Sequence, residues 1–539
     1  MGREIKFRRL GTMLDCSRNA VPTVQTLKKW IDLTSDLGYN TFMMFTADTY
    51  EIEGDPYCGY MRGRYSKKEL KEIDDYCAQK GMELIPCIQT LAHLEMLLRW
   101  PPYAGYADSE DTLLIGDERT YQLLDRMFAT VAEIFTSRTI MINFDEAYMV
   151  GRGKYYELHG PCDRFMLLME HLRKLDEIAK KHGFTSMIMS ADVFFKIGGG
   201  DYYNWKAEIP QEALNHLPED VELCYWDYHM PEIERYDGMI KRHQEMDRSM
   251  WFWGASWTWK RFAPKYHLSM MATQASMGRC LAHNVPDFLI TMWGDDGGEC
   301  SYFGALPLVF QAAEMARGNN DLADIKARFE KKYGFPFDRF LLLGMPDAPG
   351  YDQDYTNPDR YLLYSDCFLG VMDSTIAGGE NEQYAKCARR LSRVNKDGEW
   401  GYLFKNIQAL CELLSVKAEL GVKTREVYHS GDREALLALI GDYKKALKKL
   451  EVFHRTFREQ WFRENKPHGF DVQDIRLGGL AARIRSCMER LQDLYDGKIT
   501  VIEELEEKVL DVLGNGEELG RKPIWWYWDY KRNVTCNYI

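Results

Sequence analysis

The sequence predicts an α/β protein in which a (β/α)8 barrel precedes a mainly α-helical region. Up to residue 317, short apolar runs alternate with longer amphipathic ones, which gives eight strand-helix units, and the strand pattern stops near Asn319. Continuous apolar runs are typical of parallel strands buried on both faces, and eight units favour a barrel over the alternative, a doubly wound open sheet. We therefore expect a barrel over residues 1–317 and a helical domain over residues 318–539.

The expected strands follow one another in regular order. They are residues 10–14, 40–45, 83–88, 139–144, 185–190, 221–226, 250–253 and 288–293. The first helix opens at Pro22 and closes at Gly38, the usual positions for these residues. A capping box, in which Ser66 and Glu69 satisfy free backbone donors, starts the next helix. Later helices are expected over 118–135 and 163–181, which completes the pattern as far as the fifth strand.

Apolar residues at three- and four-residue spacing predict helices in the rest of the chain. They cover 380–394, 402–420, 433–460, 475–495 and 499–513, and the Pro-, Asp- and Gly-rich stretch 346–358 is the expected joint. The tail Trp525-Trp526-Tyr527-Trp528 is too aromatic to be free in water. It is expected to pack on the barrel or on the second subunit of a homodimer.

Composition narrows the class of protein. The net charge of −13 gives no attraction to nucleic acid or to an anionic membrane, and no run of about 18 apolar residues or signal-peptide pattern occurs. A cytoplasmic protein with a neutral or weakly charged substrate is expected. The 13 cysteines form no Cys-x-x-Cys pair and the 12 histidines do not cluster with them, so we expect buried free thiols, no metal and no cofactor.

Two adjacent carboxylates, Asp145 and Glu146, follow the fourth expected strand. Acidic pairs are usually solvated surface, but the C-terminal ends of barrel strands are where catalytic groups stand. Enzymes that cleave glycosidic bonds usually do so with two carboxyl groups. Because neighbouring strand residues point to opposite sides, the two share a site only where the strand breaks into its loop. The pair then suits substrate-assisted cleavage, with Glu146 as general acid and Asp145 holding a 2-acetamido group that attacks the anomeric carbon.

Other strand ends supply candidate partners for the pair. His93 follows the third strand and could hydrogen-bond Glu146, while Asp48, at the end of the second strand, could orient His93; the alternative for His93 is a structural role. Tryptophans are dense between the fifth and eighth strands, which suits a carbohydrate pocket. Trp251 and Trp253 share a strand face and are expected in the core, whereas Trp257 and Trp293 are expected in the site.

Several motifs occur in barrel order, and together they resemble glycoside hydrolase family 20, the β-N-acetylhexosaminidases, in particular a bacterial branch that begins directly with the barrel. The motifs are Met13-Leu14-Asp15-Cys16-Ser17-Arg18, Thr46-Ala47-Asp48, Leu91-Ala92-His93, Asp145-Glu146, Tyr225-Trp226-Asp227-Tyr228 and Trp293-Gly294-Asp295. The resemblance covers roughly residues 8–317.

The resemblance implies a role for each matching residue. Asp145 positions the acetamido group, Glu146 is acid and then base, and His93 with Asp48 forms the supporting relay. The implied sugar-binding residues are Trp226, Trp257, Trp293, Asp295, Tyr228 and Arg18, with Asp295 binding O4 and O6 and Tyr228 as candidate for the tyrosine that contacts the acetamido carbonyl.

The chain departs from the family pattern at two positions. Asn143 stands where the family usually has Gly, and Arg9 lies one residue further from the first-strand aspartate than the family's sugar-binding arginine. These departures keep two alternatives open beside an exo-acting β-N-acetylhexosaminidase. One is a related glycosidase for a glucosaminide, a disaccharide or a sulfated sugar, and the other is a non-catalytic sugar-binding protein.

Overall fold

A computed structural model describes residues 4–295, 297–347 and 356–512, which form two compact units. The barrel unit comprises Met1–Trp257, His267–Trp293 and Leu308–Ile325, and the helical unit comprises Thr258–Tyr266, Gly294–Pro307 and Lys326–Ile539. The segments that follow the seventh and eighth strands therefore group with the helical unit. The boundary expected after residue 317 stays a prediction.

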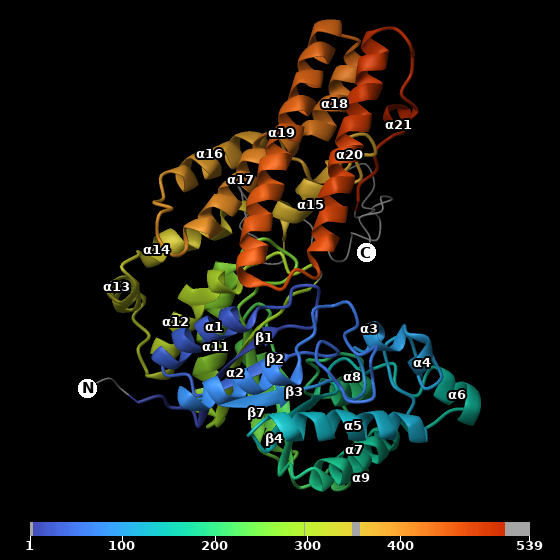
Figure 1. The fold of residues 1–539 in the computed structure, drawn as a ribbon, viewed down its shortest axis with the longest axis vertical. Helices are drawn as coiled ribbons and strands as arrows, with labels where there is room; N and C mark the ends of the chain where they lie inside the picture. The colour runs from blue at the N-terminus through green and yellow to red at the C-terminus, as the bar shows by residue number, and fades with distance from the viewer. Residues whose placement is uncertain (1–3, 296, 348–355, 513–539) are drawn as a thin grey trace. The chain divides into compact units, whose positions relative to one another are not determined.

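Eight parallel strands close into a barrel in which each strand pairs with its sequence neighbours and β8 pairs with β1, as predicted (Figure 1). They are β1 (Arg9–Asp15), β2 (Thr41–Phe45), β3 (Glu83–Cys87), β4 (Thr139–Asn143), β5 (Ser186–Ser190), β6 (Val221–Trp226), β7 (Met250–Ala255) and β8 (Asp287–Met292). Because all strands run the same way, their C-terminal residues meet at one end of the barrel, where catalytic groups are expected.

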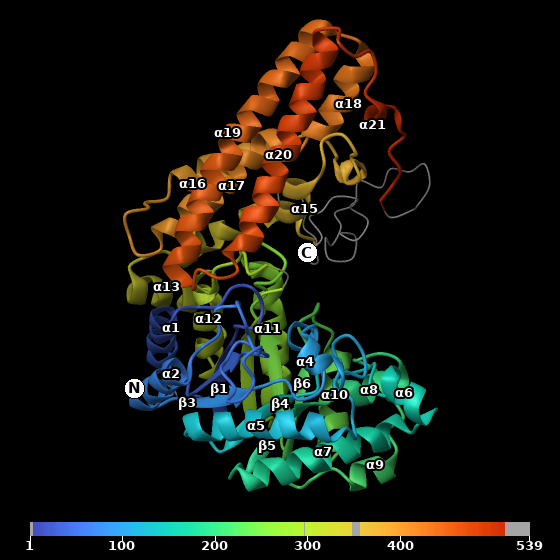
Figure 2. The same ribbon diagram turned by 45° about the vertical axis from the view of Figure 1, so that its right-hand side comes forward.

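Helices follow the strands and cover the barrel. They are α1 (Val24–Asp36), α2 (Lys67–Gln79), α3 (Glu95–Leu98), α4 (Pro101–Ala104), α5 (Glu118–Ile134), α6 (Lys154–His159), α7 (Arg164–Lys181), α8 (Asp192–Gly199), α9 (Gln211–Asn215), α10 (Ile233–Gln244), α11 (Tyr266–Ala282) and α12 (Leu306–Ala316). The next helix, α13 (Leu322–Tyr333), begins in the barrel unit and belongs to the helical unit from Lys326 onward. The capping box of Ser66 and Glu69 is confirmed at the start of α2. Helices α5 and α7 lie side by side (Figures 1 and 2).

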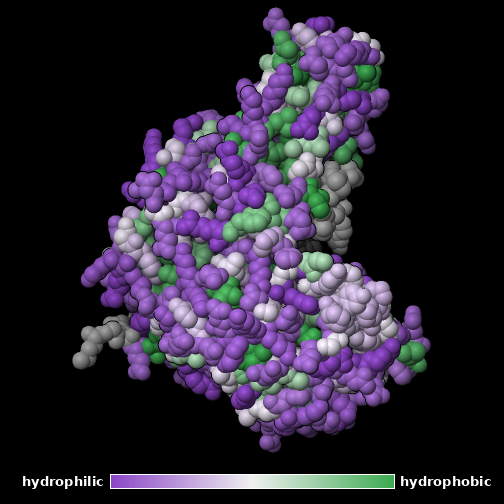
Figure 3. All heavy atoms as spheres, in the orientation of Figure 1, coloured by the Kyte–Doolittle hydropathy of each residue, from purple (hydrophilic) through white to green (hydrophobic). Residues whose placement is uncertain are grey.

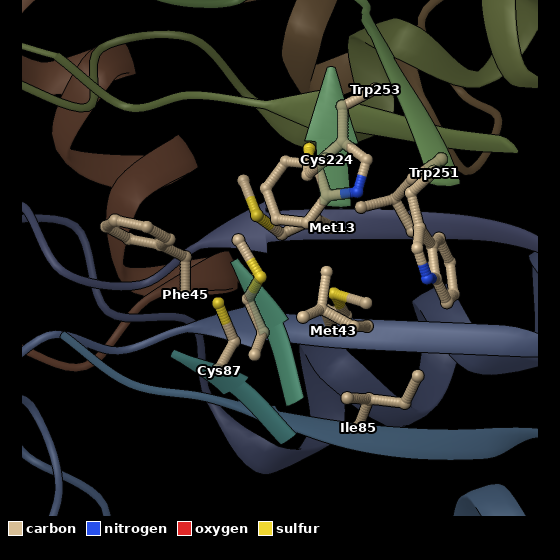
Figure 4. Packing of buried hydrophobic residues seen from close by; sticks show 11 residues of the cluster. Met13, Met43, Phe45, Ile85, Cys87, Cys224, Trp251 and Trp253 are labelled. Atoms are coloured by element: carbon tan, nitrogen blue, oxygen red, sulfur yellow. The ribbon is translucent and has the colours of Figure 1, made fainter. Parts of the chain in front are cut away.

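Side chains from all eight strands fill the barrel interior. Met13, Met43 and Ile85 project from neighbouring strands into one buried cluster that also contains Trp251 and Trp253 (Figure 4). The two tryptophans are therefore core residues, as expected. Trp251 also donates its indole N–H to Glu222 Oε2 at 2.8 Å, which satisfies the polar end of a buried ring.

The helical unit has the predicted helical character, with one correction near its end. Its elements are η1 (Tyr302–Ala305), α14 (Phe337–Phe340), η2 (Leu341–Asp347), α15 (Pro358–Tyr364), η3 (Asp373–Thr375), α16 (Glu380–Ser392), α17 (Gly401–Lys417), α18 (Leu420–Ser430), α19 (Arg433–Glu464), α20 (Phe470–Tyr495) and α21 (Glu503–Glu506). The helix expected over 499–513 was wrong, because among the described residues of this segment, 499–512, only α21 is helical. Like charges three and four residues apart, at Glu503, Glu506 and Glu507, oppose a longer helix.

A buried ionic network lies within the helical unit. Glu299 Oε1 pairs with Arg476 Nη1 at 3.0 Å and with Arg360 Nη2 at 3.2 Å, and all three side chains are buried. The Asn357 amide donates to the Lys260 carbonyl at 2.9 Å. Helices α15 and α20 thereby hold both loop segments of this unit, 258–266 and 294–307, in place.

The hydropathy of the surface and the burial of the cysteines are those of an ordinary folded protein. Hydrophilic residues cover most of the face seen in Figure 3. Among the described residues, no helix is long and apolar enough to cross a membrane, and no group of three or more His, Cys, Asp or Glu side chains is arranged to hold a metal ion. The cysteines in that part of the chain are free thiols, and nearly all are buried. The tail 525–528 lies outside the described residues.

Candidate active site

Strand β4 breaks at its C-terminal end. Its pairing with β5 shifts register between Met141 and Asn143, and the backbone then takes positive φ at Asn143 (64°), Phe144 (79°) and Glu146 (54°). Asn is among the residues that best tolerate this conformation, which accounts for Asn143 at a position where Gly is also suited. The break removes the strand alternation, so Asp145 and Glu146 can present their carboxyls to the same partner.

That shared partner is His93. Its Nε2 lies 3.4 Å from Asp145 Oδ2 and 3.5 Å from Glu146 Oε2. Burial disfavours the imidazolium, but the charges of Asp145 and Glu146 outweigh it and raise the pKa of His93 to about 10. The ring is therefore a cation at neutral pH that links the two carboxyls.

Asp145 is the more enclosed of the two acids. Its side chain is 16% exposed, against 44% for Glu146, and Gln89 Nε2 donates to Asp145 Oδ1 at 3.2 Å. Burial raises the pKa of Asp145, and the charge of His93 opposes this effect. The two neighbours thus have different environments, with Asp145 held by fixed donors and Glu146 open toward solvent.

Asp192, just past β5, holds the backbone of Glu146. The Glu146 N–H donates to Asp192 Oδ2 at 2.9 Å, Ser190 Oγ donates to Asp192 Oδ1, and the Trp226 indole donates to Ser190 Oγ at 3.0 Å. Burial raises the pKa of Asp192 to about 7. This chain of hydrogen bonds fixes the strained Glu146 backbone and connects it to an aromatic side chain of β6.

Aromatic rings border the acidic pair within the barrel unit. Trp226 stacks on Tyr228 with ring centroids 5.2 Å apart, and Tyr202 lies 5.6 Å from Trp226. Burial, and after it the charge of Glu146, raises the pKa of Tyr202. The site therefore combines carboxyls with flat apolar surfaces that suit a sugar ring.

Tyr228, Trp257 and Trp293 are connected to one another. Trp293 lies 6.4 Å from the Tyr228 ring and 4.9 Å from the ring of Phe45. The Trp257 indole donates to the Tyr228 carbonyl at 2.6 Å, and Trp257 is only 1% exposed. Trp257 thus supports Tyr228, while its predicted contact with a sugar stays a prediction.

Asp48 and Arg18 lie at the ends of neighbouring strands. The Asp48 carboxylate accepts a hydrogen bond from Arg62 Nη1 and not from His93, so the expected relay through Asp48 stays a prediction. Arg18 lies 3.7 Å from Asp15 Oδ2, and its charge acts on His93. Arg18, in the loop that follows β1, is therefore the arginine of this region that lies near the site.

Two other sequence candidates lie elsewhere. Arg9 is the first residue of β1, over the Trp251 ring and 3.2 Å from Glu83 Oε2, so it stands at the end of the barrel opposite to Asp145. Asp295 belongs to the helical unit, where its carbonyl accepts the Lys260 N–H. Its proposed contact with sugar hydroxyls stays a prediction.

Two residues of the site, Arg62 and Tyr202, were absent from the sequence-based candidates. Gln89 and Asp192 stand just beyond strand ends, where catalytic groups were expected, but the sequence assigned neither of them a role. Arg62 and Tyr202 lie in loops whose paths the sequence pattern does not predict.

The comparisons with known proteins agree with this geometry. A model of the glycosyl hydrolase family 20 catalytic domain matches residues 6–237, and a model of the glycoside hydrolase 20C C-terminal domain matches residues 338–523. The chain belongs to glycoside hydrolase family 20. Its barrel unit thus contains a family 20 catalytic domain, and its helical unit contains a C-terminal domain described within that family.

Individual relatives are distant. Hexosaminidase D of Bos taurus is 24% identical over 250 residues, covering 44% of this chain and 68% of that protein, and Hexosaminidase D of Homo sapiens is 27% identical over 222 residues, covering 39% and 43%. The chain thus spans less than half of the human relative. Among solved structures, Flavobacterium johnsoniae chitobiase is 15% identical with a TM-score of 0.48, covering 93% of this chain and 74% of that chain.

Proposed function

We propose that this family 20 enzyme is an exo-acting β-N-acetylhexosaminidase that removes terminal GlcNAc or GalNAc by a retaining, substrate-assisted mechanism. The observation that carries the proposal is the broken end of β4, where Asp145 and Glu146 converge on one His93 ring. Carboxyls joined by one imidazolium do not face each other across a sugar, so a nucleophile supplied by the substrate fits better than an enzymic one.

Each carboxyl then has one task. Glu146, the more exposed acid, protonates the glycosidic oxygen while the acetamido carbonyl oxygen attacks the anomeric carbon, which breaks the bond to the leaving group and forms an oxazolinium ion. Asp145 accepts the amide N–H and stabilises the positive charge of that ring. Glu146, now a carboxylate, takes a proton from water as the water adds to the anomeric carbon, so the configuration is retained.

Paired substitutions test these assignments. Glu146→Gln and Asp145→Asn should each lose most turnover of an aryl β-N-acetylglucosaminide, by at least about 100-fold. The Glu146→Gln loss should shrink for an aryl leaving group of low pKa, because such a group needs no proton, while the Asp145→Asn loss should persist. Glu157→Gln on α6, an exposed glutamate, is the matched control. Undiminished activity in either active-site variant would refute the assignment.

A second candidate function is a family 20 glycosidase with altered specificity. The position of Arg9 at the opposite end of β1 favours it, because the expected hydroxyl-binding arginine is missing from that place. Comparing the hydrolysis of aryl glucosaminide and aryl N-acetylglucosaminide distinguishes the two. Faster cleavage of the unacetylated substrate would favour this alternative. Cytoplasmic location and a homodimer stay predictions.

A further inference from the structure

A small cavity lies beside Asp192 in the wall of the barrel. It has a volume of about 10 Å³ and is bordered by residues of α8, β6 and α10, which lie next to one another in Figure 2. Asp192, Tyr203, Cys224 and His243 are among the residues that line it. A cavity of this size has room for one water molecule, provided that polar groups are present to bind it.

Two of the lining residues have a buried polar atom without a hydrogen-bond partner among the described residues: the Tyr203 hydroxyl and His243 Nε2. His243 Nδ1 lies 2.8 Å from the Met239 carbonyl, so Nδ1 carries the hydrogen and Nε2 is an acceptor. Burial lowers the pKa of His243 to about 4, which keeps the ring neutral. Burial also raises the pKa of Tyr203, so its hydroxyl remains a donor. Native proteins rarely leave such atoms unpaired.

The carboxylate of Asp192 is the third polar group of the cavity. It accepts the Glu146 N–H at Oδ2 and the Ser190 hydroxyl at Oδ1, and each carboxylate oxygen can accept a further hydrogen bond. Burial and the negative charges of Asp145 and Glu146 disfavour the ionised form of Asp192. A further hydrogen-bond donor in the cavity would therefore favour the carboxylate over the neutral acid.

The three groups match the hydrogen-bonding capacity of one water molecule. A water donates two hydrogens and accepts at least one, and the cavity offers two acceptors, Asp192 and His243 Nε2, and one donor, Tyr203. An anion is repelled by the Asp192 carboxylate. We propose that a buried water bridges Tyr203, His243 and Asp192, so that Tyr203 and His243 are positioning residues for the general acid Glu146. This inference rests on the proposed hexosaminidase function.

The water acts on Glu146 through the protonation state of Asp192. The ionised carboxylate accepts the Glu146 N–H more strongly than the neutral acid, so it holds the backbone of the general acid, with its φ of 54°, more firmly. By donating to Asp192, the water lowers the pH at which Asp192 takes up a proton. Lys196, one turn further along α8, donates to the Gly200 carbonyl. The titratable groups that face Asp192, none of them a cation near neutral pH, are Asp145, Glu146, Tyr202, Tyr203, Cys224, Tyr225 and His243.

Tyr203→Phe removes the one hydroxyl that the water accepts from. The readout is the ratio of kcat/KM in the variant to that in wild type, for an aryl β-N-acetylglucosaminide, as a function of pH. The ratio should lie within about twofold of one at about pH 8.5, where Asp192 is ionised in both proteins, and should fall about threefold or more by about pH 6, because the variant protonates Asp192 at a higher pH. A loss of packing alone would lower the ratio equally at every pH.

Tyr236→Phe is the matched control, because the Tyr236 hydroxyl is also buried but does not line the cavity, and its ratio should not vary with pH. His243→Phe should reproduce the pH-dependent loss of Tyr203→Phe. His243→Gln, whose amide oxygen can accept from the water, should lose less. A ratio for Tyr203→Phe that stays constant with pH, or the same pH-dependent fall in Tyr236→Phe, would overturn the proposal.

A crystal structure of the wild-type protein gives a readout that does not depend on activity. An ordered water within about 3.2 Å of Tyr203 Oη, His243 Nε2 and an Asp192 oxygen is expected. A cavity without such a water, or a direct hydrogen bond from Tyr203 to His243, would overturn the proposal. Absence of wild-type hydrolysis of the aryl substrate would instead refute the hexosaminidase function, so the two failures are distinguishable.

Discussion

Replacing Asp192 by Ala should lower activity by releasing the backbone of the acid. Glu146 has a φ of 54°, a conformation that costs a non-glycine residue about 1–3 kcal/mol and persists only when its surroundings enforce it. At a pH above about 8, where Asp192 is ionised although burial raises its pKa to about 7, the Glu146 N–H bond to Asp192 Oδ2, at 2.9 Å, is worth about 1.5–3 kcal/mol as a bond to a charged acceptor. Losing it should lower the productive population, and kcat/KM with it, by about 10- to 100-fold.

The amide replacement is the matched control. Asp192→Asn keeps an oxygen that can accept the Glu146 N–H, so kcat/KM should fall by no more than about 10-fold. The assay is steady-state hydrolysis of an aryl β-N-acetylglucosaminide, with thermal unfolding to show that both variants fold. A loss below about threefold in the Ala variant, or equal losses in Ala and Asn, would refute the reasoning that Asp192 acts by holding this backbone.

Three other predictions concern the helical unit, the imidazolium and the strand break. Arg476→Gln should destabilise the helical unit by about 3–5 kcal/mol in denaturant unfolding, because Glu299 loses a buried partner; an unchanged midpoint would contradict it. Since the pKa of His93 is raised, the contribution of the charged ring to folding stability is full below pH 6.5 and is lost as pH rises through about 10. His93→Gln should therefore abolish that part of the loss of stability at alkaline pH. Identical profiles of stability against pH in the two proteins would argue against a charged His93. Asn143→Gly and Asn143→Ala both remove the buried 2.8 Å hydrogen bond from Asn143 Nδ2 to the Ile88 carbonyl, so both should destabilise the protein. Ala should cost about 1 kcal/mol more than Gly at φ 64°, and equal melting temperatures of the two variants would exclude strain there.

Local sequence patterns were enough to predict the barrel. A parallel strand buried on both faces appears as a short apolar run, and β6 was predicted with its observed bounds, 221–226. The capping box of α2 was equally readable, because both partners lie within four residues. The 499–513 segment failed because its apolar spacing was weighed without the repulsion among its glutamates.

The candidate site was predictable as a set of strand ends but not as a set of contacts. Asp145, Glu146 and His93 meet because β4 breaks through residues with positive φ, a backbone path that no residue pattern specified. Arg62, which lies in a loop of turns, pairs with the Asp48 carboxylate. Asp192 accepts a hydrogen bond from the backbone N–H of Glu146, and a backbone group leaves no signal in the sequence. Contacts between distant loops depend on the folded backbone, so they required the structure.

The most direct test of the central claim varies the nucleophile that the substrate is proposed to supply. Aryl β-glucosaminides carrying N-acetyl, N-fluoroacetyl, N-difluoroacetyl and N-trifluoroacetyl groups have a progressively less nucleophilic amide carbonyl. If this oxygen attacks the anomeric carbon while Asp145 holds the amide, kcat/KM should fall steeply along the series, by about 100-fold or more in total. A flat series with wild type would contradict substrate assistance and would require a nucleophile on the enzyme.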